Sequence, residues 1–286
     1  MLLTAQSVPE CGGPPPLWPS TRRRPKSFNR HPLSRTLTAL LLLCVFRAPA
    51  ADSTDAEVQG RQLVQHLLDQ RPTENYTNTG VLHIRGAHGK TTEVPVRVEI
   101  KVTATNWSAT YEAAVGTNRL ASLYIAHEAD RRVEYYYRTN LVLGAIPILS
   151  PLFRSPKLAA GETMTAFAGS DFWIADLGLE FLQWPQQKLV KKEVKRSQGC
   201  SVLESVNPNP AAHDYARVVS WIDSENGGIV QAFAYDAQDQ LLKEFYPENF
   251  KKVNGEWRVG KMEMDNDQSK SSTILKFDLD DGSPKK

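Results

Sequence analysis

The chain has few cysteines. Three occur in 286 residues, and two of them, Cys11 and Cys44, fall in an N-terminal stretch with the features of a leader, which leaves Cys200 in the rest of the chain. A single cysteine forms no disulfide within its own domain, so stability must come from a hydrophobic core. A domain of about 235 residues buries roughly 70–75% of its unfolded surface, which is enough for such a core.

Net charge is also nearly absent. The formal charge is +2 at pH 7, whereas nucleic-acid binders usually carry a strong basic excess, so we expect no nucleic-acid partner. Residues 1–51 contain seven of the 34 basic residues and one of the 32 acidic ones, so the rest of the chain is slightly acidic. A hydrophobic share of 41% with 23% charged residues is typical of a globular protein and excludes a wholly disordered one.

Long apolar runs are scarce as well. The longest, at residues 37–46, has about half of the ~20 residues that a membrane-spanning helix needs. Basic residues precede this run and the small residues Ala48 and Ala50 follow it, which is the order of features in an export signal. We therefore expect cleavage beside Ala50 and Ala51, and export of a single soluble domain, residues 52–286.

Two details of the leader, residues 1–51, refine this prediction. Lipid attachment needs a small residue just before the cysteine, but Leu43 precedes Cys44, so no lipidation is expected. The first thirty residues are rich in Pro and Arg and are long for the basic part of a signal. A translation start assigned too far upstream would explain that extension.

The sequence lacks the residue spacings of metal and catalytic sites. Its six histidines show no paired spacing such as HExxH, so no zinc site is expected. Cys200, His213 and Asp214 include the groups of a thiol nucleophile, its base and an orienting acid. However, Cys200 lies in a strand-like run and His213 in a loop rich in Pro and Asn. We therefore expect no enzymatic activity and no cofactor.

One helix is expected near the start of the exported domain, over residues 55–69. Apolar residues recur there at spacings of three and four and form one stripe: Ala56, Leu63, Val64, Leu67 and Leu68. The helix should end before Pro72. Residues 93–102 instead alternate apolar and polar side chains, which is typical of a strand with one buried face.

Strand-like runs then continue to the C-terminus. They occupy residues 79–85, 93–102, 107–114, 120–127, 132–138, 188–196, 200–206, 215–223, 229–237, 241–253, 256–265 and 272–279. Asn254 and Gly255 between two of these runs predict a type I′ hairpin turn. The apolar residues are odd-numbered before Gly260 (Trp257, Val259) and even-numbered after it (Met262, Met264), which predicts a β-bulge at the glycine. Roughly eleven strands after one helix indicate a mainly β (α+β) fold, built as a strongly curved sheet or a barrel.

Residues 141–182 fit neither pattern. Their first part is apolar but broken by Pro147 and Pro151, which predicts an irregular segment. Ser170 is a candidate N-cap for a helical turn over residues 171–177 that ends near Gly178. The aromatic residues of this segment either form a lid that faces a ligand or plug one end of the barrel.

Several segments carry a family resemblance. They are GSDFWIADLGLEFLQWP at 169–185 and the segments 200–205, 207–210, 215–223 and 250–257. Together they resemble the outer-membrane lipoprotein-sorting proteins, in a poorly characterised branch of the LolA/LolB-like superfamily, and the resemblance covers about residues 56–280. It implies a periplasmic, half-open antiparallel β-barrel that is closed on one side by helical and loop elements. The implied ligands are lipoprotein acyl chains or phospholipid, and the implied partners are inner- or outer-membrane lipoprotein-transfer proteins.

These observations lead to the hypothesis of a periplasmic carrier that holds acyl chains in an apolar cavity. A curved sheet with an apolar inner face either fills its interior or leaves a cavity, and cavities of ~300–1,000 Å³ suit ligands. The candidate wall and lid residues are Val96, Val98, Ile100, Trp107, Tyr111, Phe172, Trp173, Leu177, Phe181, Trp184 and Trp221. The alternatives are a non-transporting envelope module with the same fold, used for protein binding or structure, and a lipid-acting hydrolase.

Overall fold

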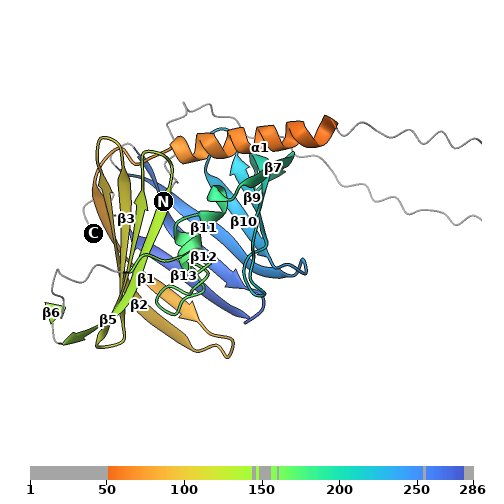
Figure 1. Ribbon diagram of the computed structural model, residues 1–286. Coiled ribbons are helices and arrows are strands. Elements are labelled where there is room, and N and C mark those ends of the chain that lie inside the picture. The colour runs from red at the N-terminus through yellow and green to blue at the C-terminus, as the bar shows by residue number, and fades with distance from the viewer. Residues whose placement is uncertain (1–50, 144–145, 148–155, 160, 254–255, 280–286) are drawn as a thin grey trace, which may run out of the picture.

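Figure 1 shows the computed structural model, which describes residues 51–143, 146–147, 156–159, 161–253 and 256–279. The expected export signal, up to the cleavage site after Ala50, lies outside these residues. So do the Asn254-Gly255 turn and most of the apolar segment around Pro151. Within the part of the chain that the structure describes, no helix combines the length and the apolar character needed to cross a membrane.

The predicted helix is α1 (Ala51–Asp69), which ends before Pro72 as expected. Val64 and Leu67 of its apolar stripe are buried in the main core. The helix crosses one end of the sheet and packs on strand β7 (Gln186–Lys195) (Figure 1). Contact is close at Gly60, where a Cβ atom would lie 2.7 Å from the Cα atom of Lys188. A larger residue at this position would force the helix away from the strand.

The described residues form one antiparallel sheet of thirteen strands, of which β6 has only two residues. The remaining strands are β1 (Tyr76–Arg85), β2 (Thr91–Val102), β3 (Trp107–Val115), β4 (Arg119–His127), β5 (Val133–Leu143), β6 (Ile146–Pro147), β8 (Gln198–Val206), β9 (Arg217–Asp223), β10 (Ile229–Tyr235), β11 (Leu241–Val253), β12 (Glu256–Asn266) and β13 (Ser271–Asp278). Each run predicted from the sequence corresponds to one of these strands.

The strand order is β6-β5-β4-β3-β2-β1-β13-β12-β11-β10-β9-β8-β7. The chain therefore forms two meanders, and its first and last strands join them by pairing in the middle of the sheet, with Gly80 opposite Phe277. The ends of the sheet, β6 and β7, are not paired with each other in the described residues. This arrangement confirms the half-open antiparallel barrel (Figure 1).

The alternation in β2 sets its two faces as predicted. Val94, Val96, Val98 and Ile100 are buried in the main core, while the residues between them are wholly or partly exposed. In a strand, successive side chains point to opposite faces, so the alternating sequence fixes which set can be buried together.

The hairpin between β11 and β12 has the predicted two-residue connection, because Val253 pairs with Glu256. The predicted bulge at Gly260 is wrong. Glu248 pairs with Lys261 and Phe250 with Val259, so the register is unchanged across the glycine. Asn249 opposite has a positive φ of 53°, and its carbonyl oxygen lies where a Cβ atom of residue 260 would be. The glycine is needed for this close approach.

The predicted helical turn is shorter than expected and has a different cap. It comprises α2 (Ile174–Leu177), followed by Gly178 and the 3₁₀ helix η1 (Glu180–Gln183). Ser170 is not the N-cap, because its hydroxyl donates to the carbonyl oxygen of Phe167 at 2.7 Å, within a turn that precedes the helix. Asp176 accepts the backbone N–H of Trp173 instead, at 2.7 Å.

We call residues 167–184 the plug. This segment, green in Figure 1, lies inside the curve of the sheet. Its apolar residues join those of β2, β3, β9 and β11–β13 in the main core. A second, smaller cluster contains Cys200, Val202, Trp221 and Val230. The main core is thus formed by the inner face of the sheet and the plug.

Candidate functional site

The inner wall of the sheet contains five of the predicted site residues. Val96, Val98 and Ile100 of β2 and Trp107 and Tyr111 of β3 are all buried in the main core. The Trp107 ring stacks on the ring of His127, with centroids 3.6 Å apart. Tyr111 meets the edge of Phe167 in the plug at 6.1 Å, and burial raises the pKa of its hydroxyl.

The plug supplies five more of the predicted residues. Phe172, Leu177, Phe181 and Trp184 are buried, and Trp173 is half-buried against them. The Trp173 ring stacks on Tyr215 at a centroid distance of 4.5 Å. The structure therefore brings ten of the eleven predicted residues together in one core. The aromatic segment, for which the sequence left a lid and a plug open, is packed inside the sheet as a plug.

Trp221 lies apart from the other ten residues. In β9, Val218 and Ile222 join the main core, and Trp221 belongs to the second cluster. Its indole N–H donates to Glu193 at 2.6 Å, and the ammonium of Lys195 lies 4.7 Å from its ring centroid. Trp221 is thus not part of the interior wall. The alternation separates Trp221 from Val218 and Ile222, but the sequence alone did not show which set faces inward.

The interior contains little free space. Two cavities of about 30 Å³ and 10 Å³ remain beside the plug, compared with the ~300–1,000 Å³ of typical ligand pockets. The larger holds about one or two water molecules by volume. The interior is filled by the chain's own side chains.

A buried charge cluster lies at the larger of these cavities. The side chain of Lys243 in β11 is 2% exposed. Its ammonium donates to the carbonyl oxygen of Asp171 at 2.6 Å and lies 3.6 Å from a carboxylate oxygen of Asp176. It also lies 3.6 Å from the ring centroid of Trp173. Burial lowers the pKa of Lys243 to about 8, although both neighbouring carboxylates oppose this shift.

The two aspartates of the plug are held differently. Asp176 accepts hydrogen bonds from the Tyr215 hydroxyl at 3.2 Å and from the Trp173 N–H at 2.7 Å, and burial raises its pKa. Asp171 instead accepts one hydroxyl on each carboxylate oxygen, from Thr273 and Ser271 of β13. No sequence motif indicated this charge cluster, because its residues lie far apart in the chain.

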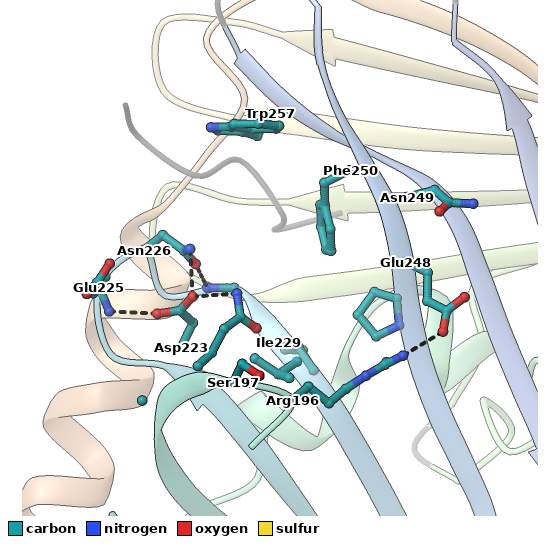
Figure 2. Close-up of a pocket in the computed structure, with 15 residues that line it drawn as sticks. Arg196, Ser197, Asp223, Glu225, Asn226, Ile229, Glu248, Asn249, Phe250 and Trp257 are labelled. Atoms are coloured by element: carbon teal, nitrogen blue, oxygen red, sulfur yellow. Dashed lines mark hydrogen bonds and ion pairs between the residues drawn. The ribbon is translucent and has the colours of Figure 1, made fainter. Parts of the chain in front are cut away.

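A cleft of about 820 Å³ opens at the end of the sheet near the β9–β10 loop. In Figure 2, the loop with Asp223, Glu225 and Asn226 stands on one side of it and the rings of Phe250 and Trp257 on the other. Apolar lining comes from Ile229, Val230, Pro247, Phe250 and Trp257. None of the eleven predicted residues is among the described residues that line it.

Hydrogen bonds of Asp223 shape the polar side of the cleft. Its carboxylate accepts from the backbone N–H of Glu225 at 2.8 Å and the side-chain amide of Asn226 at 2.8 Å. The side chain of Gln198 donates to it at 3.1 Å. Across the opening, Arg196 donates to Glu248 at 2.6 Å (Figure 2). Arg196 and Glu248 therefore form an ion pair at the rim, while Asp223 is held by neutral N–H donors.

The cleft and the interior cavities lie next to one another. Ile229 lines both the cleft and the cavity of about 10 Å³, and its buried side chain lies between them. The smaller cavity shares Asp176, Leu179 and Phe245 with the cavity of about 30 Å³, which reaches Lys243. No sequence motif indicated these spaces, because their lining comes from several strands, from loops and from the plug.

The groups considered for thiol chemistry are not arranged for it. Cys200 is buried in the second cluster, and burial raises the pKa of its thiol. His213 is exposed, in the loop between β8 and β9. Across residues 51–143 and the other described ranges, no three His, Cys, Asp or Glu residues gather as metal ligands would.

Comparison with known proteins identifies the fold. A DUF1329 family protein from Desulfovibrio piger matches with a TM-score of 0.61 at 17% identity, over 78% of this chain and 91% of that one. A domain assigned by name to outer membrane lipoprotein sorting, from Vibrio parahaemolyticus, matches with a TM-score of 0.60 at 17% identity, over 78% and 92%. The fold implied by the sequence resemblance is therefore confirmed.

Comparison at the level of sequence matches only part of the chain. A family model described as an uncharacterised protein matches residues 149–280, which include the plug and the second meander. No curated protein matches the chain.

Proposed function

We propose that this protein is an exported, periplasmic carrier that binds the acyl chains of lipoproteins or lipids in outer-membrane lipoprotein sorting. One observation carries the proposal: a cleft of about 820 Å³, lined in part by apolar residues, opens at the mouth of the half-open barrel and adjoins its apolar core at Ile229. Its volume is within the ~300–1,000 Å³ range of ligand sites. The likeness in fold to a domain named for lipoprotein sorting supports the same assignment.

Binding would need no chemical reaction and no cofactor. Each CH₂ group of an acyl chain that leaves water contributes about 0.8 kcal/mol. In the first stage the chain would lie against Phe250, Trp257 and Ile229 in the cleft. A chain that reaches Val96, Val98 and Ile100 must displace the plug, because the remaining interior cavities are too small. The ligands would come from, and pass to, lipoprotein-transfer proteins of the two membranes.

The test uses the protein exported with its own leader and purified from the periplasm. Native mass spectrometry should detect co-purified lipid or acylated peptide, and the protein should take up a fluorescent fatty-acid probe. Phe250→Glu places a charge in the cleft at a side chain that is 42% exposed, so the fold should persist. We expect probe affinity to fall at least tenfold.

Leu141→Glu is the matched control. Leu141 is 61% exposed at the far end of the sheet, in β5, and its replacement should leave probe affinity unchanged. Equal affinity in the wild type and in folded Phe250→Glu protein would remove the cleft from the proposal.

The filled interior favours one second candidate, a non-transporting envelope module. Such a protein would keep the packed core as its final state and use an outer surface to bind another protein. It would purify without lipid and would not bind the fluorescent probe at any probe concentration that leaves the protein folded. A carrier takes up and releases the probe unchanged.

A further inference from the structure

Lys243 places a buried positive charge in mostly apolar surroundings. The cavity beside it is otherwise lined mostly by apolar residues, among them Val218, Ala232, Phe245 and Met264. A charge removed from water is stable only when it is paired and hydrogen-bonded. Replacing a buried ion pair with apolar residues is often neutral or stabilising, so such a pair is poor evidence for a purely structural role.

The close partners of this ammonium come from the plug. They are the carbonyl oxygen of Asp171, the carboxylate of Asp176 and the ring of Trp173. Tyr215 of the sheet side lies farther away, with its ring centroid at 5.4 Å. A ligand that enters by displacing the plug therefore separates Lys243 from these three partners together.

The other carboxylate near Lys243 is that of Asp171, which also belongs to the plug and would move away with it. In the present state both of its oxygens accept hydroxyl groups from β13, and its backbone N–H donates to Thr273 at 2.9 Å. An anion that pairs with Lys243 in the loaded state must then come from the ligand. In the present state, Asp176 with the neighbouring Leu177 and Leu179 places a carboxylate and apolar groups where such a ligand would lie.

We infer that Lys243 recognises the anionic head group of an acyl ligand, and that the interior is selective for long-chain carboxylates over neutral lipids of the same length. In the unloaded protein, the Asp176 carboxylate occupies the position beside Lys243 that the ligand carboxylate would take. Exchange of one carboxylate for another keeps the ammonium paired throughout, whereas a neutral ligand leaves it buried without an anion. This inference rests on the proposed carrier function and narrows its ligands to lipids with a free anionic head group, because the ester- and amide-linked acyl chains of a lipoprotein carry none.

The test compares three twelve-carbon ligands, laurate, 1-dodecanol and dodecyl phosphate, as competitors of a fluorescent probe on the delipidated, exported protein. We expect laurate to bind at least tenfold more tightly than dodecanol. Dodecyl phosphate separates the two sources of an oxyanion: weaker binding than laurate supports a carboxylate site, and tighter binding overturns the assignment to a carboxylate.

The key variant removes both charges, Lys243→Met with Asp176→Asn. The asparagine oxygen can still accept from Trp173 and Tyr215, so the plug keeps these contacts and the fold should be retained. We expect the preference for laurate over dodecanol to disappear while dodecanol still binds. Lys276→Met, at an exposed lysine of β13, should keep the full preference.

The outcomes separate this inference from the carrier proposal. If the wild type binds laurate and dodecanol equally, the head-group inference fails and the carrier proposal stands. If the folded double variant keeps the tenfold preference, Lys243 is not the recognition site. If the wild type binds none of the three ligands, the carrier proposal itself fails.

Discussion

The interior of the curved sheet and the cleft at its mouth share strands β9–β12. The interior is packed with side chains, whereas the cleft is open. In the interior, Phe172 and the other plug residues occupy the space and leave cavities of about 30 Å³ and 10 Å³. In the cleft, Phe250 remains 42% exposed beside about 820 Å³ of open space. Apolar character therefore does not distinguish a binding surface from a packed core. What distinguishes them is whether another part of the chain covers the surface.

The charged groups of the two regions follow the same division. Arg196 and Glu248 pair at the rim of the cleft, where their side chains are 41% and 30% exposed, and such exposed pairs contribute little to stability. Lys243 and Asp176 pair inside, with 2% and 13% exposure. Breaking a pair inside a core is costly, so in the proposed carrier the interior pair would constrain which ligand can enter.

The largest expected difference between the two regions is in stability. Phe172→Ala should lower the free energy of unfolding by about 3–5 kcal/mol, because it opens a cavity in a packed core. Phe250→Ala should lower it by about 0.5 kcal/mol or less, as for exposed substitutions. Urea unfolding followed by tryptophan fluorescence measures both values. Similar losses at the two positions would mean that the cleft is packed in solution.

A smaller effect should come from His127, which stacks on Trp107 at the interior wall. Burial lowers its pKa to about 3, from the ordinary 6.5. Between pH 6.5 and 3 the unfolded chain therefore binds a proton that the folded chain does not, and stability falls as the pH falls. At pH 4.5 the loss from this group should be about 3 kcal/mol.

His127→Phe checks this expectation. The new ring keeps the stacking on Trp107 but cannot take up a proton. Unfolding measured at pH 8 gives the packing difference between variant and wild type, and unfolding at pH 4.5 adds the protonation effect. The variant should lose about 3 kcal/mol less than the wild type on acidification; an equal loss would show that other groups cause the acid sensitivity.

The smallest effect should come from Trp221, the predicted site residue that lies in the second cluster. Trp221→Phe removes the hydrogen bond to Glu193 and should cost about 1 kcal/mol of stability. Fatty-acid probe affinity should stay within twofold of the wild type. A tenfold loss of affinity in the folded variant would place the binding surface on the β8–β10 side that carries the second cluster.

Local patterns predicted the elements of the fold. Alternation in residues 93–102 predicted β2, the stripe from Leu63 to Leu68 predicted α1, and the turn residues 254–255 predicted the pairing of Val253 with Glu256. Each depends on the backbone geometry of neighbouring residues, which a short stretch of sequence largely determines.

Predictions that depended on distant residues were less successful. Gly260 is required by the carbonyl of Asn249 on the partner strand rather than by a bulge. Ser170 bonds Phe167 because the helix begins later, at Ile174, where Asp176 supplies the cap. Neither partner can be recognised without the path of the chain between them.

The sequence by itself determined one helix, the strand-like runs that follow it and an apolar set of residues, because side-chain periodicity follows from the 3.6-residue helix and the two-residue strand repeat. Tertiary structure decided the rest. It paired β1 with β13, turned Trp221 away from the interior and set the plug against the wall. It also joined Lys243 to Asp171 and Asp176 across about seventy residues of chain. Such contacts depend on how whole elements pack, and packing is a property of the folded chain rather than of any one segment.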